Sequence, residues 1–492
     1  MKDFETKVGK GGRKMSPSSS QYRAALAIAR RLRDAGHQAF FAGGCVRDLL
    51  LGLAPQDYDV ATSATPGEIV ALFPKTFTVG AHFGVVLVCQ HFDEQDIATE
   101  SGAPGERSRL AGVVEVATFR SDGAYSDGRR PDAVRYTTDP REDVLRRDFT
   151  INGLLLDPLA TGDLTSAALD FVHGREDLAA RIIRAIGDPA LRFAEDKLRM
   201  LRAVRFAARL DFQIDAATSS AILRHSAGIA LVSAERIRDE LTRILTEGGA
   251  RRGFELLFDL GFLAEVLPEA VRLRGVAQPP EFHPEGDVWT HTMLMLENLP
   301  PNCASTLAWA ALLHDIGKPA TYQPPKPAVP GSNEKPGRIR FNGHVEAGVR
   351  IAETILARLR FSGDDTAQIL SLIANHMRFG DALQMKQSTL KRFLRMPRFH
   401  EHLALHRLDA ISAHGDLTCY NFARAHFDAE PTPDLRPAPL LTGRDLIAAG
   451  YRPSPQFKPM LALAEDAQLE GAITTPEQAL ALVQATFPLA NR

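Results

Sequence analysis

Two carboxylates, Asp57 and Asp59, are the residues of this sequence whose type and spacing most directly suggest chemistry. They lie two positions apart in DYDVAT (57–62), a predicted short strand, so both side chains would point to the same face. Carboxylate oxygens on one rigid face can hold one or two Mg²⁺ ions, with substrate phosphates completing the coordination. Two such ions can stabilise both the attacking and the leaving oxygen of a phosphoryl displacement. A solvated strand edge is the alternative interpretation of an isolated Asp-x-Asp.

The residues around this pair favour the chemical interpretation. Gly43 and Gly44 end the preceding predicted strand, and Arg47 follows on a predicted short helix. Glycines let backbone N–H groups approach a triphosphate, and a helix N-terminus with an arginine favours its negative charge. Glu115 on another predicted strand supplies a third acidic group for the metal, although a structural ion pair explains it equally well.

Four segments resemble, in order, the motifs of the class II tRNA nucleotidyltransferase and bacterial poly(A) polymerase family. GGCVRDLLLGLAPQDYDVATSATP (43–66) resembles the catalytic signature, and RRDFTINGLL (146–155) resembles the second motif. FAEDKLRMLRAVRFAARL (193–210) resembles the nucleotide-selecting motif, and SAERIRDELTRIL (233–245) resembles the helix that follows it. Together these matches span about residues 22–270.

The resemblance implies a role for each matched residue. Asp57 and Asp59 would hold the catalytic metal and activate an RNA 3′-hydroxyl for attack on the α-phosphate of a nucleotide. Asp196 and Arg199, at i and i+3 of a predicted helix 191–210, would share one face and select CTP or ATP. The expected nucleotide-binding residues are Gly43, Gly44, Arg47, Asp48, Arg147, Asp148, Asn152, Asp196, Arg199, Arg202 and Arg205. Structural ion pairs are the alternative for the charged members of this set.

Two basic clusters are candidate RNA-binding surfaces. Residues 191–209 contain six Lys or Arg against two acids, and KRFLRMPR (391–398) interleaves basic residues with a phenylalanine. The expected RNA-binding residues are Arg192, Arg209, Lys391, Arg392 and Arg395. Solvated charged faces are the alternative, but a tRNA substrate requires contacts to phosphate and 2′-hydroxyl groups.

Histidines and aspartates in residues 291–409 form a second set of candidate metal ligands. Imidazole and carboxylate groups suit transition metals or Mg²⁺. LLHDIGKP (312–319) resembles the metal-dependent phosphohydrolase superfamily named after its His-Asp pair, which implies metal-activated water attacking a phosphate ester. The expected ligands are His291, His314, Asp315, His344, His376 and Asp409. A retained fold without activity is the alternative, and His283, His402, His406 and His414 are interpreted as structural.

The elements that must position these groups divide into an α/β part and a helical part. Apolar spacing predicts a helix over 22–35 and strands in 36–44, 83–88 and 113–119. From about residue 188 the pattern is almost wholly helical, including 233–246. We therefore predict an α+β fold with a small mixed-sheet, polymerase beta-like nucleotidyltransferase head, an all-helical neck and body, and a helical HD domain.

Composition shifts predict the domain boundaries. The predicted parts are a disordered basic tail (1–20), a catalytic nucleotidyltransferase head (21–155), a helical nucleotide-selecting and RNA-binding neck and body (156–275), an HD-type domain (276–430), and a linker with a helical tail (431–492). Residues 90–112 and 320–338 are interpreted as surface-loop insertions.

Composition excludes several classes of protein. The 492 residues are 45% hydrophobic and 24% charged, which excludes a collagen-like or wholly disordered chain. Lys and Arg number 58 against 60 Asp and Glu, so the total charge does not indicate a nucleic-acid coat protein. The four cysteines form no CxxC pair, which favours a reducing cytoplasm, and no apolar run is long enough to span a membrane.

We therefore expect an enzyme that adds or repairs the 3′-terminal CCA of tRNA from CTP and ATP, with Mg²⁺ in the head. The HD site would bind a divalent transition metal or Mg²⁺ and add a phosphatase or phosphodiesterase activity. The expected partners are the tRNA 3′ end, ATP and CTP, with no membrane and no obligate protein partner. The alternatives are a poly(A) polymerase, an enzyme that adds only A, or an HD phosphohydrolase whose head merely binds RNA.

Overall fold

The computed structural model describes residues 19–78, 84–90, 112–123, 133–161, 166–325, 337–429 and 437–489. Most of the predicted tail 1–20 and of the predicted insertions 90–112 and 320–338 lies outside these residues. The chain divides into two compact units, Met1–Glu240 with Leu256–Val266 and Leu241–Glu255 with Leu267–Arg492.

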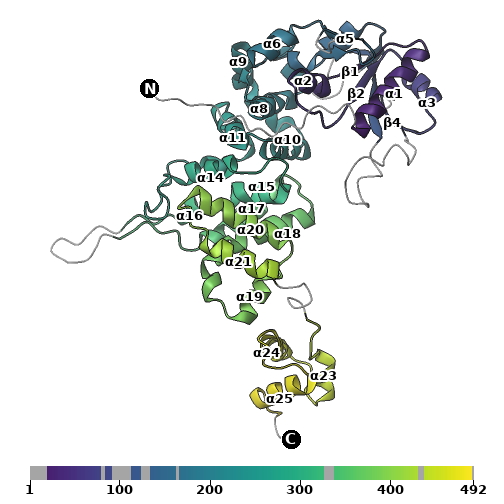
Figure 1. The fold of residues 1–492 in the computed structure, drawn as a ribbon. Coiled ribbons are helices and arrows are strands. Elements are labelled where there is room, and N and C mark those ends of the chain that lie inside the picture. Colours follow the sequence, from purple (N-terminus) through teal and green to yellow (C-terminus); the bar gives the residue numbers. More distant parts are fainter. Residues whose placement is uncertain are drawn as a thin grey trace, which may run out of the picture. The chain divides into compact units, whose positions relative to one another are not determined.

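A mixed sheet forms the centre of the first unit, in the part of Figure 1 labelled β1, β2 and β4. Within the described residues it has seven strands in the order β3-β4-β5-β2-β1-β8-β9, of which only β2 and β5 are paired in parallel. The strands are β1 (Ala39–Ala42), β2 (Asp59–Thr62), β3 (Thr76–Phe77), β4 (Val85–Cys89), β5 (Val113–Thr118), β8 (Leu154–Leu156) and β9 (Ala168–Asp170). A further hairpin pairs β6 (Arg120–Asp122) with β7 (Val134–Tyr136).

Short helices with clear start signals cover this sheet. The helix α1 (Ser20–Asp34) begins where the Ser19 side chain accepts the backbone N–H of Tyr22, and its buried Ala, Ile and Leu residues lie on one face. The helix α2 (Gly44–Leu50) follows Gly43, whose φ of 72° suits glycine. A capping box of Thr65 and Glu68 starts α3 (Pro66–Leu72), and α5 (Pro140–Leu145) precedes the second motif.

The predicted continuous helix over 191–210 is wrong. It is two helices, α7 (Pro189–Glu195) and α8 (Leu198–Leu210), separated at Asp196, whose backbone is extended (φ −146°, ψ 106°). The Asp196 carboxylate accepts the backbone N–H of Leu198 at 3.1 Å, so a local hydrogen bond competes with helix continuation. The remaining helices of this region are α6 (Gly174–Ala180), α9 (Ala216–His225), α10 (Ala234–Thr246), α11 (Ala250–Asp259) and α12 (Phe262–Val266).

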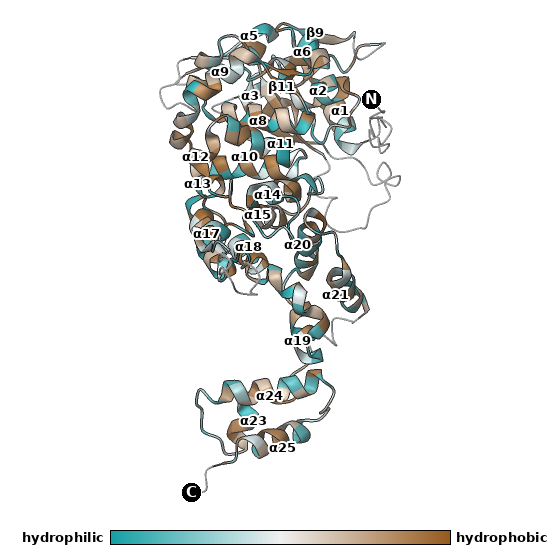
Figure 2. Ribbon diagram, turned by 90° about the vertical axis from the view of Figure 1, so that its left-hand side faces the viewer, coloured by the Kyte–Doolittle hydropathy of each residue, from teal (hydrophilic) through white to brown (hydrophobic). Residues whose placement is uncertain are grey.

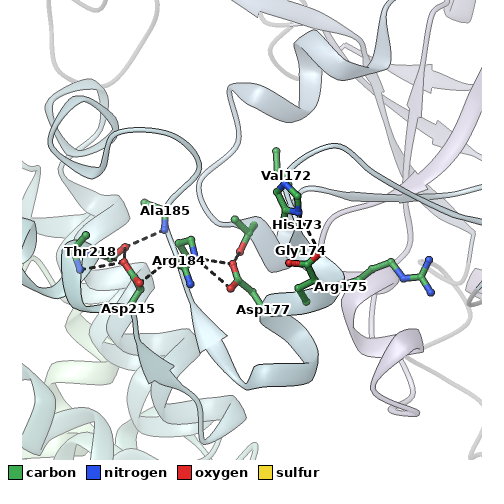
Figure 3. Close-up of polar contacts among 12 residues, drawn as sticks. Val172, His173, Gly174, Arg175, Asp177, Arg184, Ala185, Asp215 and Thr218 are labelled. Atoms are coloured by element: carbon green, nitrogen blue, oxygen red, sulfur yellow. Dashed lines mark hydrogen bonds and ion pairs between the residues drawn. The ribbon is translucent and has the colours of Figure 1, made fainter.

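An arginine-centred network joins the segments that follow the sheet. Strand β10 (Ile182–Ile183) pairs in parallel with β11 (Gln213–Ile214), and Arg184 directly follows β10. Figure 3 shows Arg184 between Asp177 and Asp215. The guanidinium nitrogens of Arg184 lie 3.0 Å from Asp177 Oδ2 and 2.6 Å from Asp215 Oδ1. Thr218 Oγ1 accepts the backbone N–H of Ala185 at 3.2 Å. These contacts tie α6 and α9 to the short two-stranded sheet.

The second unit is helical in the residues that the structure describes. Its central helix α15 (Ser305–Leu313) is buried from Thr306 to Leu313 and packs against α14 (Val288–Glu297), α18 (Gly363–Asn375) and α20 (Phe399–Ser412). The other elements are α13 (Pro268–Val271), α16 (Lys318–Thr321), α17 (His344–Arg358), the 3₁₀ helix η4 (His376–Gln384), α19 (Gln387–Leu394) and α21 (Thr418–Ala429).

Three C-terminal helices have a hydrophobic core of their own. They are α23 (Gly443–Ala448), α24 (Phe457–Leu469) and α25 (Pro476–Thr486), and Leu446, Met460 and Val483 are buried between them. In Figure 2 each of these helices carries both brown hydrophobic and teal hydrophilic residues. A mixed sheet followed by helices confirms the predicted α+β class. Among the described helices, none has the length and apolar character needed to cross a membrane.

Candidate active sites

Acidic and basic side chains from strands and from the segment after α5 line a cavity of about 310 Å³ in the first unit. Asp59 opens β2, Glu115 lies on the neighbouring β5, and Arg147 follows α5. Asp57 is exposed and precedes β2, so the prediction that it lies on the strand is wrong, because β2 begins at Asp59. The lining residues are Ala42, Asp59, Val60, Ala61, Val85, Glu115, Ala117, Arg120, Arg146 and Arg147.

The electrostatics of this cavity suit a divalent cation. Burial and the neighbouring charges of Glu115 and Asp57 raise the pKa of Asp59 to about 7, although Arg147 opposes the shift. Burial and Asp57 also raise the pKa of Glu115. The carboxylates of Asp57, Asp59 and Glu115 repel one another, and a bound divalent cation would stabilise their ionised state, although their oxygens do not all lie within 4.8 Å of one another. In the type of their donor atoms these residues fit the predicted metal ion.

Gly43 lets the backbone pass close to the charged groups. A Cβ at this position would lie 3.4 Å from Arg147 Nη1 and 4.0 Å from Asp59 Oδ2, and the positive φ disfavours any side chain. Arg147 is held by Asp143 at 2.9 Å. Arg120 and Arg146 also line the cavity, and neither was expected from the sequence. The cavity can therefore receive a polyanion such as a triphosphate.

The first and second motifs meet in one hydrogen-bond network. Arg47 donates from Nε to Asp48 and from Nη1 to Asn152, both at 2.8 Å. Asn152 donates in turn to Asp148 at 3.2 Å, and Arg202 of α8 pairs with Asp148 at 2.6 Å. Burial would raise the pKa of Asp148, but Arg202 and Asn152 lower it to about 2. The structure thus brings five predicted nucleotide-binding residues together, with Arg47 and Asp148 both buried.

The prediction that Asp196 and Arg199 lie on one face of a single helix is wrong. Because the helix breaks at Asp196, its carboxylate pairs with Arg236 of α10 at 2.7 Å. Arg199 instead pairs with Glu195 at 2.5 Å and donates to the backbone carbonyl of Arg146 at 3.0 Å. Arg236 is thus a candidate functional residue that the sequence did not indicate, since its partner lies 40 positions away.

The other arginines of this region also have acidic partners. Arg205 is buried and pairs with Glu240 at 2.8 Å. Arg209 pairs with Asp48 at 3.1 Å, and Arg192 with Glu195 at 3.1 Å. An RNA-binding role for Arg192 and Arg209 stays a prediction.

The basic cluster of α19 contacts the acidic face of α24. Arg392 binds Glu465 at 2.6 Å and also pairs with Asp466, while Arg395 binds Glu465 at 2.7 Å. The interleaved Phe393 is buried in the core beside this face. RNA binding by Lys391, Arg392 and Arg395 stays a prediction.

In the second unit, the predicted histidines and aspartates lie together, and we call them the histidine centre. Ring centroids of His291 and His314 are 5.4 Å apart, and those of His376 lie 5.5 Å from both His314 and His344. Potential ligand atoms group around Asp315, with His291 and His314 on one side and His344 and His376 on the other. The members of the histidine centre are His291, His314, Asp315, His344, His376 and Asp409.

Hydrogen bonds leave one nitrogen of each ring available for a ligand. His314, His344 and His376 place Nδ1 at 2.7–3.0 Å from the backbone carbonyl three residues upstream, which makes Nδ1 the protonated atom. Nε2 of His314 lies 3.1 Å from Asp315 Oδ2 and Nε2 of His344 lies 3.8 Å from Asp315 Oδ1, in both cases buried and without an aligned hydrogen bond among the described residues. Buried nitrogens that converge on the Asp315 carboxylate in this way fit a metal ion.

The side chains of the histidine centre strongly shift one another's pKa values. Burial would lower the pKa of His291, but hydrogen bonds to Asp409 and Glu285 raise it to about 9. Burial and the neighbouring His314 lower the pKa of His376 to about 4. Buried Asp315 has its pKa held well below the usual range by His314 and Lys318, which lies 2.7 Å away.

Sequence reasoning missed three residues at this centre. Glu285 accepts from His283 Nδ1 at 2.8 Å and from His291 Nδ1 at 2.7 Å, so His283 is more than an isolated structural histidine. Gln278 accepts from Lys318 Nζ at 2.7 Å. These residues lie in the loop before α14, where no periodic pattern points to them.

Three family models match successive parts of the chain. Residues 39–184 match the poly A polymerase head domain. Residues 211–273 match the probable RNA and SrmB-binding site of polymerase A, and residues 287–414 match the HD domain.

Curated relatives with the name CCA-adding enzyme are similar over part of their length. The protein of Geobacillus sp. (strain WCH70) is 40% identical over 241 residues, which are 49% of this chain and 53% of the relative. That of Geobacillus thermodenitrificans (strain NG80-2) is 36% identical over 296 residues, 60% of this chain and 63% of the relative. The chain thus spans between about half and two thirds of the length of these relatives.

Solved structures of CCA-adding enzymes share the fold over nearly the whole chain. The Bacillus stearothermophilus CCA-adding enzyme in complex with CTP has a TM-score of 0.68 at 24% identity, covering 96% of this chain and 98% of that one. The Thermotoga maritima CCA-adding enzyme complexed with tRNA has a TM-score of 0.53 at 16% identity, covering 96% and 97%. These identities establish similarity of fold.

Proposed function

We propose that this chain, whose residues 39–184 match the poly A polymerase head domain, adds or repairs the 3′-terminal CCA of tRNA from CTP and ATP. The observation that carries the proposal is the cavity in which Asp59, Glu115 and Arg147 meet beside Gly43. The names of the curated relatives, and the CTP and tRNA complexes of the structural neighbours, support CCA addition over the other activities of this fold.

In the catalytic step the RNA 3′-hydroxyl loses its proton and attacks the α-phosphate in line, which forms a phosphodiester bond and releases pyrophosphate without a covalent enzyme intermediate. Asp57 and Asp59 would hold Mg²⁺, with Glu115 as a further carboxylate, since a donor set of oxygens alone suits this ion. When bound, the metal would neutralise charge on the triphosphate and lower the pKa of the attacking 3′-hydroxyl. Arg147 binds triphosphate oxygens that the backbone at Gly43 and Gly44 approaches closely.

Nucleotide selection involves the break between α7 and α8. Asp196 presents a carboxylate and Arg199 a guanidinium from the two sides of this break, and together they can satisfy a base edge. The Arg47, Asn152, Asp148 and Arg202 network holds the ribose and triphosphate side of the site.

We also propose that the histidine centre is a divalent-metal site with phosphatase or phosphodiesterase activity. Its mixed imidazole and carboxylate donors accept a transition metal or Mg²⁺. Lys318 beside Asp315 would steady a phosphate. We place the enzyme in the cytoplasm, where its tRNA substrate and a reducing environment coincide.

The test uses purified full-length protein with Mg²⁺, all four nucleotides singly and mixed, and tRNA transcripts that lack CCA, CA or A. Sequenced products should show completion to CCA, and Asp59→Ala should abolish it. Addition of A only, long A tails on generic RNA, or no extension would each refute CCA synthesis.

A second assay separates the two centres. His314→Ala should abolish metal-dependent phosphate release from nucleotides or RNA ends, and it should leave nucleotide addition intact. If both activities disappear together in His314→Ala, the division of labour is wrong.

A further inference from the structure

His291 differs from the other histidines of the histidine centre in how its Nδ1 is held. His314 and His376 follow the last residues of α15 and α18, where the carbonyl three residues upstream lacks a helical partner and accepts from Nδ1. His291 lies inside α14, and the corresponding carbonyl of Val288 already accepts from Thr292. The Nδ1 of His291 therefore needs an acceptor from outside its own helix.

Glu285 supplies that acceptor from the loop before α14. Its Oε1 lies 2.7 Å from His291 Nδ1 and 2.8 Å from His283 Nδ1. Its Oε2 is buried and has no hydrogen-bond partner among the described residues. Nε2, the opposite nitrogen of the His291 ring, lies 3.2 Å from Asp409 and is the nitrogen that faces the centre.

The loop itself is anchored, so the carboxylate is rigidly placed. Asp287 accepts the backbone N–H of Thr290 at 2.8 Å and that of Gly275 at 2.7 Å. These bonds fix both the start of α14 and the position of the segment that carries Glu285.

We propose that Glu285 is the positioning residue of the histidine centre. It keeps Nδ1 of His291 as the protonated nitrogen and directs Nε2, which lies 3.2 Å from Asp409, toward a metal ion, and its negative charge makes Nε2 a stronger donor. His283 keeps the carboxylate aligned from the other side. The proposal rests on the proposed metal site, and it assigns to Glu285 a role that a backbone carbonyl fills for the other three rings.

The test measures Co²⁺ affinity of the metal-stripped full-length protein by calorimetry and by the visible absorption of the bound ion. His314→Ala supplies the baseline for binding outside the histidine centre. Because removal of an outer-shell partner typically costs about 10–100-fold in metal affinity, Glu285→Ala should weaken Co²⁺ binding by that factor and change the absorption spectrum. Glu285→Gln, which keeps an acceptor oxygen but lacks the charge, should lie between wild type and Glu285→Ala.

Glu281→Gln is the matched control, because Glu281 is exposed in the same loop. It should bind Co²⁺ like the wild type, and nucleotide addition by the head should be unchanged in every variant. Wild-type affinity and spectrum in Glu285→Ala would overturn the positioning role alone. Wild-type affinity in Glu285→Gln would overturn the contribution of charge. If wild type and His314→Ala bind Co²⁺ equally, the metal site itself is refuted, and the role of Glu285 with it.

Discussion

Replacing Asp59 by Asn should stabilise the metal-free first unit while abolishing nucleotide addition. The pKa of Asp59 is raised from 3.8 to about 7 by burial and by Glu115. Because the pKa of Asp59 is higher in the folded than in the unfolded state, the stability that its protonated form contributes is fully present below pH 3.8 and is lost as the pH rises through 7. At about 1.4 kcal/mol per pKa unit, ionised Asp59 destabilises the folded unit by at most about 4 kcal/mol, because its partial solvent contact screens the charge.

Asn cannot ionise, so the gain in unfolding free energy of Asp59→Asn over the wild type should depend on pH. Between pH 5.5 and pH 8 the unfolding free energy of the wild type should fall by about 2 kcal/mol more than that of Asp59→Asn, because this part of the Asp59 titration lies in that pH range. Hydrogen exchange of peptides from β2 and β5, measured in EDTA, reports the unfolding free energy of the first unit separately from the second. Added Mg²⁺ should reduce the difference in unfolding free energy between Asp59→Asn and the wild type, because binding of the ion would stabilise the ionised wild type by mass action.

Asp57→Asn is the control, because Asp57 is exposed and precedes the strand. It should lose nucleotide addition without the pH-dependent gain in stability. If the unfolding free energies of the wild type and of Asp59→Asn change with pH in parallel, then burial and Glu115 do not destabilise the ionised Asp59. An equal gain in Asp57→Asn would place the repulsion in the cluster as a whole.

Three further substitutions probe other contacts. Gly317→Ala would place a Cβ 2.1 Å from the backbone carbonyl oxygen of His344, so the second unit should lose about 3 kcal/mol or more in thermal unfolding while nucleotide addition persists. The double variant Arg392→Ser with Arg395→Ser should lower the unfolding free energy by only about 0–1 kcal/mol per ion pair removed. It should nevertheless speed proteolytic cleavage before α24, because the ion pairs with that helix are lost. Reduced tRNA affinity with an unchanged rate of proteolysis would instead assign these arginines to RNA binding. Arg236→Ala frees the Asp196 carboxylate, so incorporation of GTP and UTP relative to CTP should rise by about tenfold in kcat/KM, and unchanged selectivity would refute the coupling.

Local chemistry accounts for what the sequence predicted correctly. The glycine turn at position 43 and the strand that contains Glu115 depend on neighbours within a few residues. The break at Asp196 was missed although its cause is also local, since an Asp side chain competes for backbone N–H groups wherever it occurs. Hydrophobic periodicity continued through the break and concealed it.

Long-range ion pairs account for the functional contacts that the sequence did not predict. Asp196 with Arg236 and Arg392 with Glu465 join residues 40 and 73 positions apart. Charge counts indicated basic surfaces at residues 191–209 and 391–398, but they could not show that folding supplies acidic partners such as Glu465 for Arg392. A cluster of arginines in sequence therefore predicts an RNA surface only after those partners have been identified.

The histidine centre shows which orienting residues a sequence can predict. A histidine just after a helix finds an unpaired carbonyl three residues back, so His314 and His376 need nothing further to direct Nε2 inward. A histidine inside a helix has no such acceptor, because hydrogen bonds of the helix itself occupy the carbonyls behind it. The position of His291 within α14 therefore requires an external acceptor such as Glu285, and helix boundaries alone could have indicated that one was missing.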